Sequence, residues 1–327
     1  MPEKRAAVEA PPLPKGLIQG GDPPPPPAKG KGAASPPSVS PHDHPHTHPE
    51  LASQGSPATP IITLTTDIGW AYAAQVKGVL LRGSPSARIV DITHTVSNHS
   101  VLEGAFLLRY SAAQFPPGSI HVCVVDPGVG SARKALIVRS RDGSLMVGPD
   151  NGVLMPLARY LGDPEAFQIQ RERVVGRGTV SATFEGRDLF APTAALLSMG
   201  HSPEELGTPT KPLSFQLPQP HIGPGSAEVS VLHIDTFGNV ITNLPFDEFV
   251  DKIGPFGTHA LVQEGARQLR ATVARTYSDL EEGCLGVLGS SFGLAEIAIG
   301  HGRADQVLSI RLGARMHLKP SEQDWRE

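Results

Sequence analysis

The fold is decided by the stretch Ile120-His121-Val122-Cys123-Val124-Val125-Asp126-Pro127-Gly128-Val129-Gly130. Its apolar, β-branched part predicts a buried strand, which stops at a carboxylate and a Pro-Gly-Val-Gly turn. In open α/β sheets ligands bind beyond the carboxyl ends of the strands, so Asp126 is a candidate reaction centre. Arg133 follows seven residues later, close enough for the loop to fold it back onto the acid. The alternative interpretation is an acid that caps a turn.

Composition divides the 327-residue chain into a tail and a folded part. Residues 1–59 hold many of the 33 prolines and almost no large apolar side chains, so we expect a disordered tail. This tail has no apolar segment typical of a secretory signal, and the chain has no apolar run long enough for a membrane span. The net charge of −4, with no basic block outside the tail, gives no indication of nucleic-acid binding.

Cysteines and histidines argue against a disulfide and against a fixed metal site. Cys123 and Cys284 both lie in apolar runs, so we expect two small core residues in a reduced, cytoplasmic protein. The tail carries alternating histidines that can bind Zn or Ni weakly, but no rigid scaffold fixes their geometry. We therefore predict no metal site. These histidines are His42, His44, His46 and His48.

Strands and helices alternate around the deciding stretch. Strands are expected at 61–67, 88–92 and 120–126, and helices at 72–81 and 101–113. Ser100 is positioned to cap the second helix, with Glu103 in its first turn. This order is typical of a mostly parallel sheet covered by helices, that is, of an α/β domain.

The pattern changes further along the chain. A hairpin (135–138 with 144–147) and helices at 153–161 and 187–199 complete a first domain over residues 60–204. Residues 205–226, rich in Pro and Gly, are the predicted linker, residues 227–317 a second domain, and 318–327 a tail. Short strands without a long helix indicate a small β-barrel or sandwich. They are expected at 227–234, 239–243, 259–262, 268–273, 285–289, 296–299 and 306–312.

Further motifs accompany Asp126 and Arg133 in a fixed order. They are Thr65-Thr66-Asp67, Asp91-Ile92-Thr93-His94 with His99, Pro149-Asp150-Asn151-Gly152, Ser181-Ala182-Thr183-Phe184-Glu185-Gly186-Arg187-Asp188, Ile234-Asp235-Thr236-Phe237-Gly238-Asn239-Val240-Ile241-Thr242-Asn243 and Gly289-Ser290-Ser291. Over residues 61–313 the set resembles the S-adenosylmethionine hydrolases (adenosine-forming), also called SAM hydroxide adenosyltransferases. The SAM-dependent fluorinase and chlorinase belong to the same superfamily.

The resemblance implies a Rossmann-like α/β domain, a C-terminal β-barrel domain and a trimer. It implies that the ligand lies between the first domain of one subunit and the second domain of its neighbour. The expected reaction is hydrolysis of S-adenosyl-L-methionine to adenosine and L-methionine, with water attacking the ribose 5′ carbon. S-adenosylmethionine is then the substrate, and no cofactor is expected.

The resemblance also implies roles for residues of the first domain. Asp126 and Arg133 match the acid and arginine of an Asp-Arg-His water site, and the halogenases carry a tyrosine where this chain has Asp126. Asp67 matches the acid that accepts hydrogen bonds from the ribose hydroxyls. His99 takes the place of a ring stacked near the ribose, with a surface histidine as the alternative. Gly186 matches the halide-binding serine of the fluorinase. Asn151 and Phe184 complete the expected substrate-binding residues of this domain.

In the second domain the resemblance implies four contacts with the substrate. Asp235, Phe237 and Asn239 match residues that hold the methionine end and pack the adenine. A hairpin tip is the alternative interpretation of this Phe-Gly-Asn turn. Ser290 matches a residue near the methionine carboxylate. The segment Gly300-His301-Gly302-Arg303 departs from the Asn and small residues that are usual in the family.

Glu185 stands where the family's third water-site residue is a histidine. An ionised glutamate only accepts hydrogen bonds, whereas a histidine can donate one and accept another. Three outcomes are open. Glu185 acts as the base while Asp126 and Arg133 orient the water, the two acids share a proton, or Glu185 turns to Arg187. In the first two, Arg133 can sit between the acids and offset their repulsion.

Two functions other than hydrolysis stay open at this point. The same pocket can serve a non-catalytic sensor that binds S-adenosylmethionine or adenosine. It can also serve a SAM-dependent halogenase, for which Asp126 and Gly186 are unfavourable.

Overall fold

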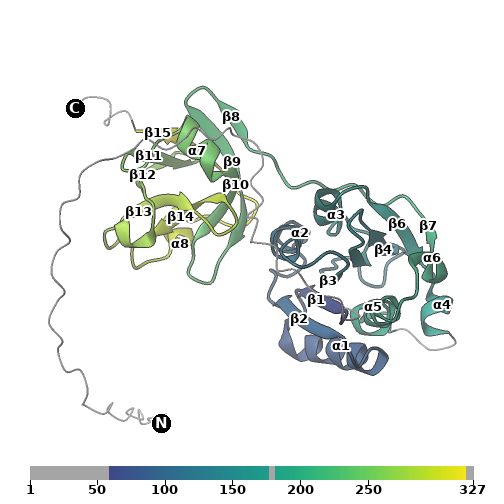
Figure 1. Cartoon of the computed structure of the whole chain (residues 1–327). Coiled ribbons are helices and arrows are strands. Elements are labelled where there is room, and N and C mark those ends of the chain that lie inside the picture. The colour runs from purple at the N-terminus through teal and green to yellow at the C-terminus, as the bar shows by residue number, and fades with distance from the viewer. Residues whose placement is uncertain (1–58, 177–180, 322–327) are drawn as a thin grey trace, which may run out of the picture. The chain divides into compact units, whose positions relative to one another are not determined.

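The computed structural model describes residues 59–176 and 181–321 (Figure 1). The predicted tail at residues 1–59 lies outside the described residues except for Thr59, and the predicted tail at 318–327 begins inside strand β15 (Arg315–Pro320). None of the helices in the described part of the chain combines the length and the apolar composition needed to cross a membrane.

The first domain is built on a seven-stranded sheet in the order β2-β1-β3-β5-β4-β6-β7. The pairs β1–β2, β1–β3 and β3–β5 are parallel, whereas β4–β5, β4–β6 and β6–β7 are antiparallel. The sheet is therefore mixed, with its parallel part where the sequence predicts it. The strands are β1 (Ile61–Thr66), β2 (Arg88–Thr93), β3 (Ile120–Val124), β4 (Ala135–Arg139), β5 (Leu145–Pro149), β6 (Glu165–Ile169) and β7 (Gly207–Pro209).

Helices cover both faces of this sheet, so that nearly every residue of β1 and β3 is buried. One core joins Ile62 and Val122 to Leu80 of α1 and Ala194 of α5. The core on the other face includes Phe106 of α2. The helices are α1 (Gly69–Gly83), α2 (Val101–Leu107), the π-helix η1 (Leu108–Ala112), α3 (Met155–Leu161), α4 (Arg171–Val175), the π-helix η2 (Gly186–Phe190), α5 (Ala191–Ser198) and α6 (Pro203–Leu206).

Local signals account for several of these elements. The Ser100 hydroxyl accepts a hydrogen bond from the backbone N–H of Glu103, so the predicted cap of α2 is confirmed. The predicted hairpin is confirmed as the antiparallel pair β4–β5. The predicted linker contains β7, which pairs with β6, and β8, which pairs with β9 of the second domain.

The second domain is a closed barrel of seven strands, as the family resemblance implies. Its order is β10-β14-β13-β12-β11-β15-β9, and pairing of β9 with β10 closes it, while β8 extends from β9. Alternating apolar residues such as Val229, Val262 and Leu318 fill its interior. The elements are β8 (His221–Gly223), β9 (Ser226–Ile234), β10 (Val240–Pro245), α7 (Phe246–Lys252), β11 (His259–Glu264), β12 (Arg267–Val273), the 3₁₀-helix η3 (Tyr277–Asp279), β13 (Leu285–Gly289), β14 (Leu294–Ile299), α8 (Ala304–Leu308) and β15 (Arg315–Pro320).

Two expectations for this domain are wrong. The predicted strand at 306–312 is instead the end of α8 and a turn, because buried Ala304 and Leu308 lie one helical turn apart and Ser309 adopts a left-handed conformation (φ 55°). The last barrel strand is β15, in which buried Met316 and Leu318 alternate with outward residues. Cys123 is buried as expected, but Cys284 is exposed, because it precedes β13; both are free thiols.

The carboxyl ends of β1 and β3 bring two acids to one edge of the sheet. Thr66 pairs with Val124 across these neighbouring parallel strands. Asp67 directly follows β1, and Asp126 follows β3 after one residue. The edge that the sequence singles out is therefore where the candidate site lies.

A buried ion pair links α2 to β9. Glu103 Oε1 lies 2.6 Å from His233 Nδ1, and Glu103 Oε2 accepts a hydrogen bond from the backbone N–H of Ser97 at 2.7 Å. Burial alone raises the pKa of Glu103, but the hydrogen bonds from His233 and Ser97 outweigh it and hold the pKa below its ordinary value of 4.5.

Glu103→Gln is expected to lower the free energy of unfolding by about 1–3 kcal/mol at neutral pH, since it removes a buried, charge-assisted interaction. Because the folded pKa lies below the unfolded one, this stabilisation is complete above about pH 4.5 and is lost as the pH falls through the folded value. Urea unfolding at pH 7 and at pH 3 measures it. Glu228→Gln, which breaks an exposed pair with Arg315 (3.0 Å), is the control. Equal losses in both variants at pH 7 would contradict this account.

Candidate active site

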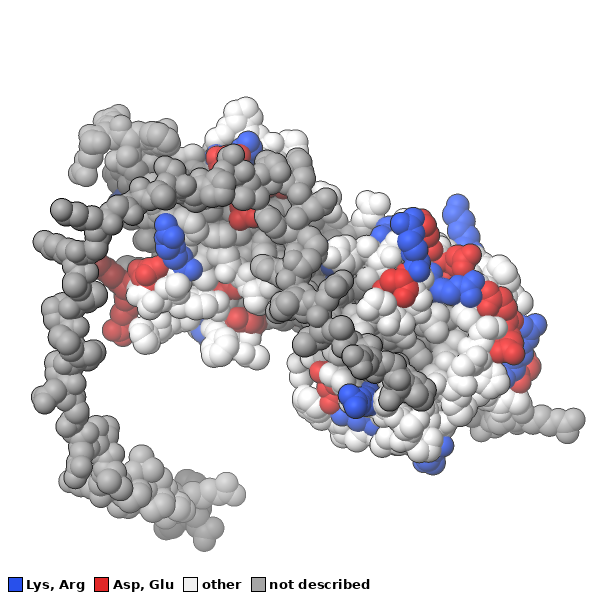
Figure 2. All heavy atoms as spheres, viewed as in Figure 1, with Lys and Arg blue, Asp and Glu red and all other residues white. Residues whose placement is uncertain are grey.

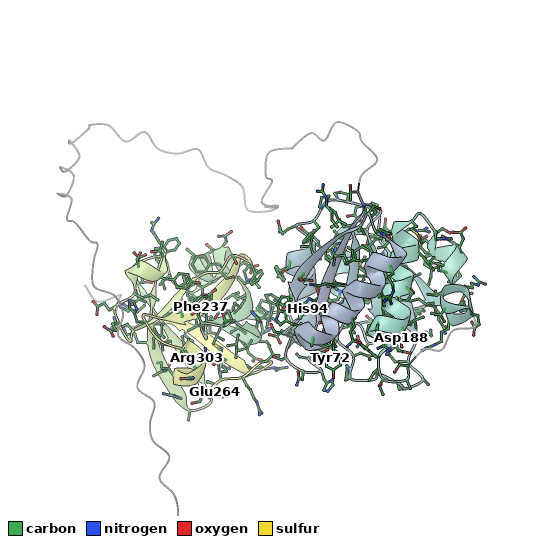
Figure 3. All side chains as sticks on the ribbon, turned by 90° about the horizontal axis from the view of Figure 1, so that it is seen from below. Tyr72, His94, Asp188, Phe237, Glu264 and Arg303 are labelled. Carbon is green, nitrogen blue, oxygen red and sulfur yellow. The ribbon has the colours of Figure 1, made fainter. Side chains whose placement is uncertain are left out.

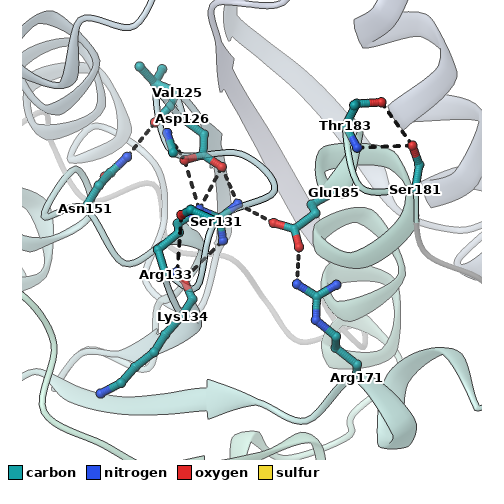
Figure 4. A network of polar contacts seen from close by, with 11 residues as sticks. Val125, Asp126, Ser131, Arg133, Lys134, Asn151, Arg171, Ser181, Thr183 and Glu185 are labelled. Atoms are coloured by element: carbon teal, nitrogen blue, oxygen red, sulfur yellow. Dashed lines mark hydrogen bonds and ion pairs between the residues drawn. The ribbon is translucent and has the colours of Figure 1, made fainter.

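Asp126, Arg133 and Glu185 form one hydrogen-bonded network (Figure 4). Arg133 Nε lies 2.9 Å from Asp126 Oδ1 and 2.8 Å from Oδ2. The same Nη2 of Arg133 contacts both Asp126 Oδ2 and Glu185 Oε2. The three predicted water-site residues are thus brought together, with the guanidinium between the two carboxylates.

The loop after β3 is shaped to fold Arg133 back onto Asp126. The backbone N–H of Gly128 donates to Asp126 Oδ1 at 3.0 Å and closes a tight turn. Gly130 has a φ of 78°, and a β-carbon there would lie 2.9 Å from the carbonyl oxygen of Ala182. Glycine therefore lets this loop approach the segment that carries Glu185.

Arg171 is a fourth member of the network that the sequence analysis missed. Its Nη2 contacts Glu185 Oε1, so Glu185 lies between two arginines (Figure 4). Arg187, the partner considered from sequence, pairs instead with Asp188 through two hydrogen bonds of 2.6 and 2.9 Å. The outcome in which Glu185 turns to Arg187 is therefore wrong.

The network is a buried, balanced set of charges. The side chains of Asp126, Glu185 and Arg133 are 6%, 5% and 10% exposed. Burial alone lowers the pKa of Arg133, but Asp126 and Glu185 outweigh it and raise the pKa above its ordinary value. Arg133 is therefore a permanent cation held between the two carboxyl groups.

A pocket of about 570 Å³ lies next to Asp67 and is lined also by His99, Phe184, Tyr72 and Arg187. Asp67 Oδ2 accepts a hydrogen bond from the backbone N–H of His99 at 2.9 Å. His99 has a φ of 63°, which turns this N–H toward the acid and leaves its ring exposed. Tyr72, labelled in Figure 3, meets Phe184 edge to face at 5.6 Å between ring centroids.

Asn151 and Gly186 act in the scaffold of this structure. Asn151 Nδ2 donates to the carbonyl of Val125 at 2.8 Å and ties the loop after β5 to the residue before Asp126. A β-carbon at Gly186 would lie 2.9 Å from Val124 Cγ1 in β3. Glycine at 186 thus allows η2 to approach the strand that leads to Asp126.

Asp235, Phe237 and Asn239 line a second pocket, of about 620 Å³, together with residues of the segment 301–303. Asp235 Oδ1 accepts from the backbone N–H groups of Phe237 and Asn239, both at 2.9 Å, and Oδ2 accepts from Asn239 Nδ2 at 3.0 Å. The turn is therefore built around Asp235 and leaves Phe237 75% exposed. Phe237 and Arg303 are labelled in Figure 3.

Ser290 and Glu296 have partners within the barrel domain. Ser290 Oγ accepts from the backbone N–H groups of Phe292 and Leu294 at 3.3 Å, and Ser290 lines neither pocket. The sequence analysis missed the interaction of Glu296 with Tyr277, whose hydroxyl donates to Glu296 Oε1 at 2.5 Å. Burial raises the pKa of Glu296, and together with the nearby charge of Asp235 it outweighs the hydrogen bond from Tyr277, which lowers this pKa.

The described residues include no group of three or more His, Cys, Asp or Glu side chains that could hold a metal ion. On the face shown in Figure 2, acidic and basic side chains lie intermixed over the described part of the α/β domain. The chemistry of the site is thus that of paired carboxylates and guanidinium groups: accepting protons, orienting a polar molecule and balancing charge.

The chain is similar to known proteins along both of its domains. Models of the SAM hydroxide adenosyltransferase N-terminal and C-terminal domains match residues 62–207 and 229–317. The "(R)-S-adenosyl-L-methionine hydrolase" of Salinispora arenicola is 37% identical over 272 residues, covering 80% of this chain and 98% of the relative. A "Fluorinase" of Actinoplanes sp. is 27% identical over 214 residues, covering 57% of this chain and 72% of the relative. A crystal structure of an uncharacterized conserved protein from Thermotoga maritima gives a TM-score of 0.74 at 36% identity, covering 79% of this chain and 99% of that one.

Proposed function

Because this chain belongs to the SAM hydroxide adenosyltransferase family, we propose that it hydrolyses S-adenosyl-L-methionine to adenosine and L-methionine. The observation that carries the proposal is the buried Asp126–Arg133–Glu185 network beyond β3, at the same sheet edge as Asp67. Water attacks the ribose 5′ carbon, a C–O bond forms there, and the bond to the sulfonium sulfur breaks. Methionine leaves with the bonding electrons as a neutral thioether, and a carboxylate takes the proton of the water.

The site has to hold the attacking water in place and to provide a proton acceptor. A thioether leaves without protonation, so no general acid is required. Water is a weak nucleophile that has to lie in line with the breaking bond. Asp126 already accepts from Arg133 and from the backbone of Gly128, whereas Glu185 accepts only from two guanidinium groups. A carboxylate has about four acceptor positions, so Glu185 can still accept a hydrogen bond from the water. We assign the base to Glu185, with Asp126 and Arg133 orienting the water.

The site favours water over halide as the nucleophile. Water can donate a hydrogen bond to the buried carboxylates Asp126 and Glu185, whereas a halide has no hydrogen to donate. A serine at position 186, as in the halogenase hypothesis, would bring its β-carbon too close to Val124. The halogenase stays an outcome of the test, as does a sensor that binds without reaction.

Asp67, His99 and Phe184 are proposed to bind the ribose. Asn151 and Gly186 are proposed to support the substrate site from the end of β3, where they contact Val125 and Val124. The backbone N–H groups that donate to Asp235 fix its turn, which presents Phe237 and Asn239; we assign these two to the adenine and methionine ends. Ser290 is assigned to the methionine carboxylate. S-adenosylmethionine is the substrate, and no cofactor takes part.

The two pockets share no lining residue. We therefore propose that a homotrimer completes the site, with the Asp67 pocket of one subunit facing the Phe237 pocket of its neighbour, in the cytoplasm. The exposed Phe237 is an apolar surface that such an assembly would cover. Sedimentation of the full chain measures the subunit number.

The test is incubation of the purified full chain with S-adenosylmethionine, followed by chromatography for adenosine and methionine. We expect equal amounts of both, independent of chloride concentration. Absence of adenosine while calorimetry still detects binding would overturn hydrolysis in favour of a sensor. Chloride-dependent formation of a 5′-halo-adenosine would establish the halogenase instead.

A further inference from the structure

We infer that Arg171 is a positioning residue for this reaction and holds Glu185 at the water site, a task that a histidine at position 185 would not require. The inference rests on the proposed function. The main observation behind it is that the two carboxylate oxygens of Glu185 contact different arginines. Oε1 contacts Arg171, and Oε2 contacts Arg133.

Charge explains why Arg171 is needed. Asp126, Arg133 and Glu185 alone carry a net charge of −1 in a place where their side chains are at most 10% exposed. Buried charge without compensation is unfavourable, so a second cation in contact with Glu185 stabilises this arrangement. Arg171 supplies it from the edge of the site, where its side chain is 43% exposed.

Geometry explains why Arg171 holds Glu185 in a defined orientation. Arg171 is the first residue of α4, and the residue before it, Gln170, donates its backbone N–H to the carbonyl of Leu206 at 2.9 Å. On the same helix, Arg173 Nη1 donates to the carbonyls of Glu204 and Gly207, both at 3.2 Å. The helix start is therefore held by several hydrogen bonds to the segment 204–207, and Arg171 reaches Glu185 from this fixed position.

A histidine at position 185 would change this requirement. A neutral imidazole brings no charge to compensate and can itself donate to Asp126 or accept from Arg133. Arg171 would then have no carboxylate at position 185 to pair with, and its charge would no longer be needed there. The glutamate at 185 and the arginine at 171 therefore work as a pair in this chain.

The test compares Arg171→Gln, Glu185→His and the double variant with the wild type, by steady-state formation of adenosine. We expect Arg171→Gln to lower kcat about 10- to 100-fold with KM changed less than about threefold, because Glu185 is displaced while the substrate pockets are intact. In the Glu185→His background the same change is expected to alter kcat less than about threefold. Arg171→Lys keeps the charge but not the planar fork, and retains part of the activity.

Arg141→Gln is the matched control, because it breaks an arginine–carboxylate pair with Asp163 whose side chains are 72% and 71% exposed. It is expected to leave kcat unchanged. Wild-type activity in Arg171→Gln, or an equal loss in the wild-type and Glu185→His backgrounds, would overturn the inference while hydrolysis stands. A wild type that forms no adenosine overturns the proposed function and the inference with it. If Arg171→Gln does not fold, Arg171→Lys alone and with Glu185→His gives the same comparison.

Discussion

Asp126→Asn is expected to reduce adenosine formation about 10²- to 10⁴-fold while binding of S-adenosylmethionine changes much less. The asparagine keeps the shape of the side chain but removes the charge that Arg133 contacts through Nε and Nη2. Arg133 would then be drawn toward Glu185 alone, and the water would lose its orienting partner. Since Asp126 lies outside the two pockets that we assign to the substrate, affinity is expected to be retained.

Single-turnover chemistry and calorimetric binding of S-adenosylmethionine measure the two quantities separately. Asp163→Asn is the control, because it also neutralises an arginine-paired aspartate, but an exposed one. Turnover of Asp126→Asn equal to that of the wild type would refute the role of Asp126. A parallel loss of binding and turnover would assign Asp126 to the substrate pocket instead.

Much of this site could be predicted because its members lie close to strand ends. Asp126 follows β3, whose residues are all buried, and the short loop to Arg133 limits where that arginine can reach. Glu185 is harder to place from sequence, because its segment, 52 residues from Arg133 along the chain, meets the loop through long-range contacts such as that of Gly130 with Ala182. The meeting of these residues depends on long-range packing that a motif alone does not specify.

Arg171 could not be assigned from its local sequence. In Arg171-Glu172-Arg173-Val174-Val175 it is one of several charged residues of a short helix, a pattern typical of a solvated face. A signal was nevertheless present. Two buried acids with one arginine need a second cation, and this need could have directed a search for it.

The wrong strand prediction in the barrel domain also results from contacts that the local sequence does not specify. Residues 306–312 contain β-branched and apolar side chains that fit a strand, but the helix is decided by the contact of Ala304 and Leu308 with the barrel core. Ser309, with its left-handed backbone, ends that helix. In β15 only Met316 and Leu318 are apolar and buried. Polar residues surround them, so the alternation typical of a strand is short in the sequence.

Arg133→Gln is expected to have the largest combined effect, on both stability and turnover. The same Nη2 nitrogen contacts both carboxylates, so the two acids lie near each other and only Arg133 separates them. Without this cation, two buried negative charges face each other, and one carboxyl group has to take up a proton or the loop has to open. Loss of one partner from a buried ion pair costs about 3–5 kcal/mol of folding free energy.

Turnover of Arg133→Gln should fall at least as far as that of Asp126→Asn, because the water loses its cation and the base loses one of its two partners. Urea unfolding at pH 7 and at pH 5 measures the stability, and we expect the deficit relative to wild type to be smaller at pH 5. The sign follows because the acidic pair of the variant binds a proton more readily when folded than when unfolded, so acid stabilises the folded variant relative to the wild type. Arg133→Lys restores the charge without the fork and is expected to recover stability more than turnover. A deficit in Arg133→Gln that grows toward pH 5 would show that the two carboxylates do not repel each other without Arg133, and the bridging role of Arg133 would have to be abandoned.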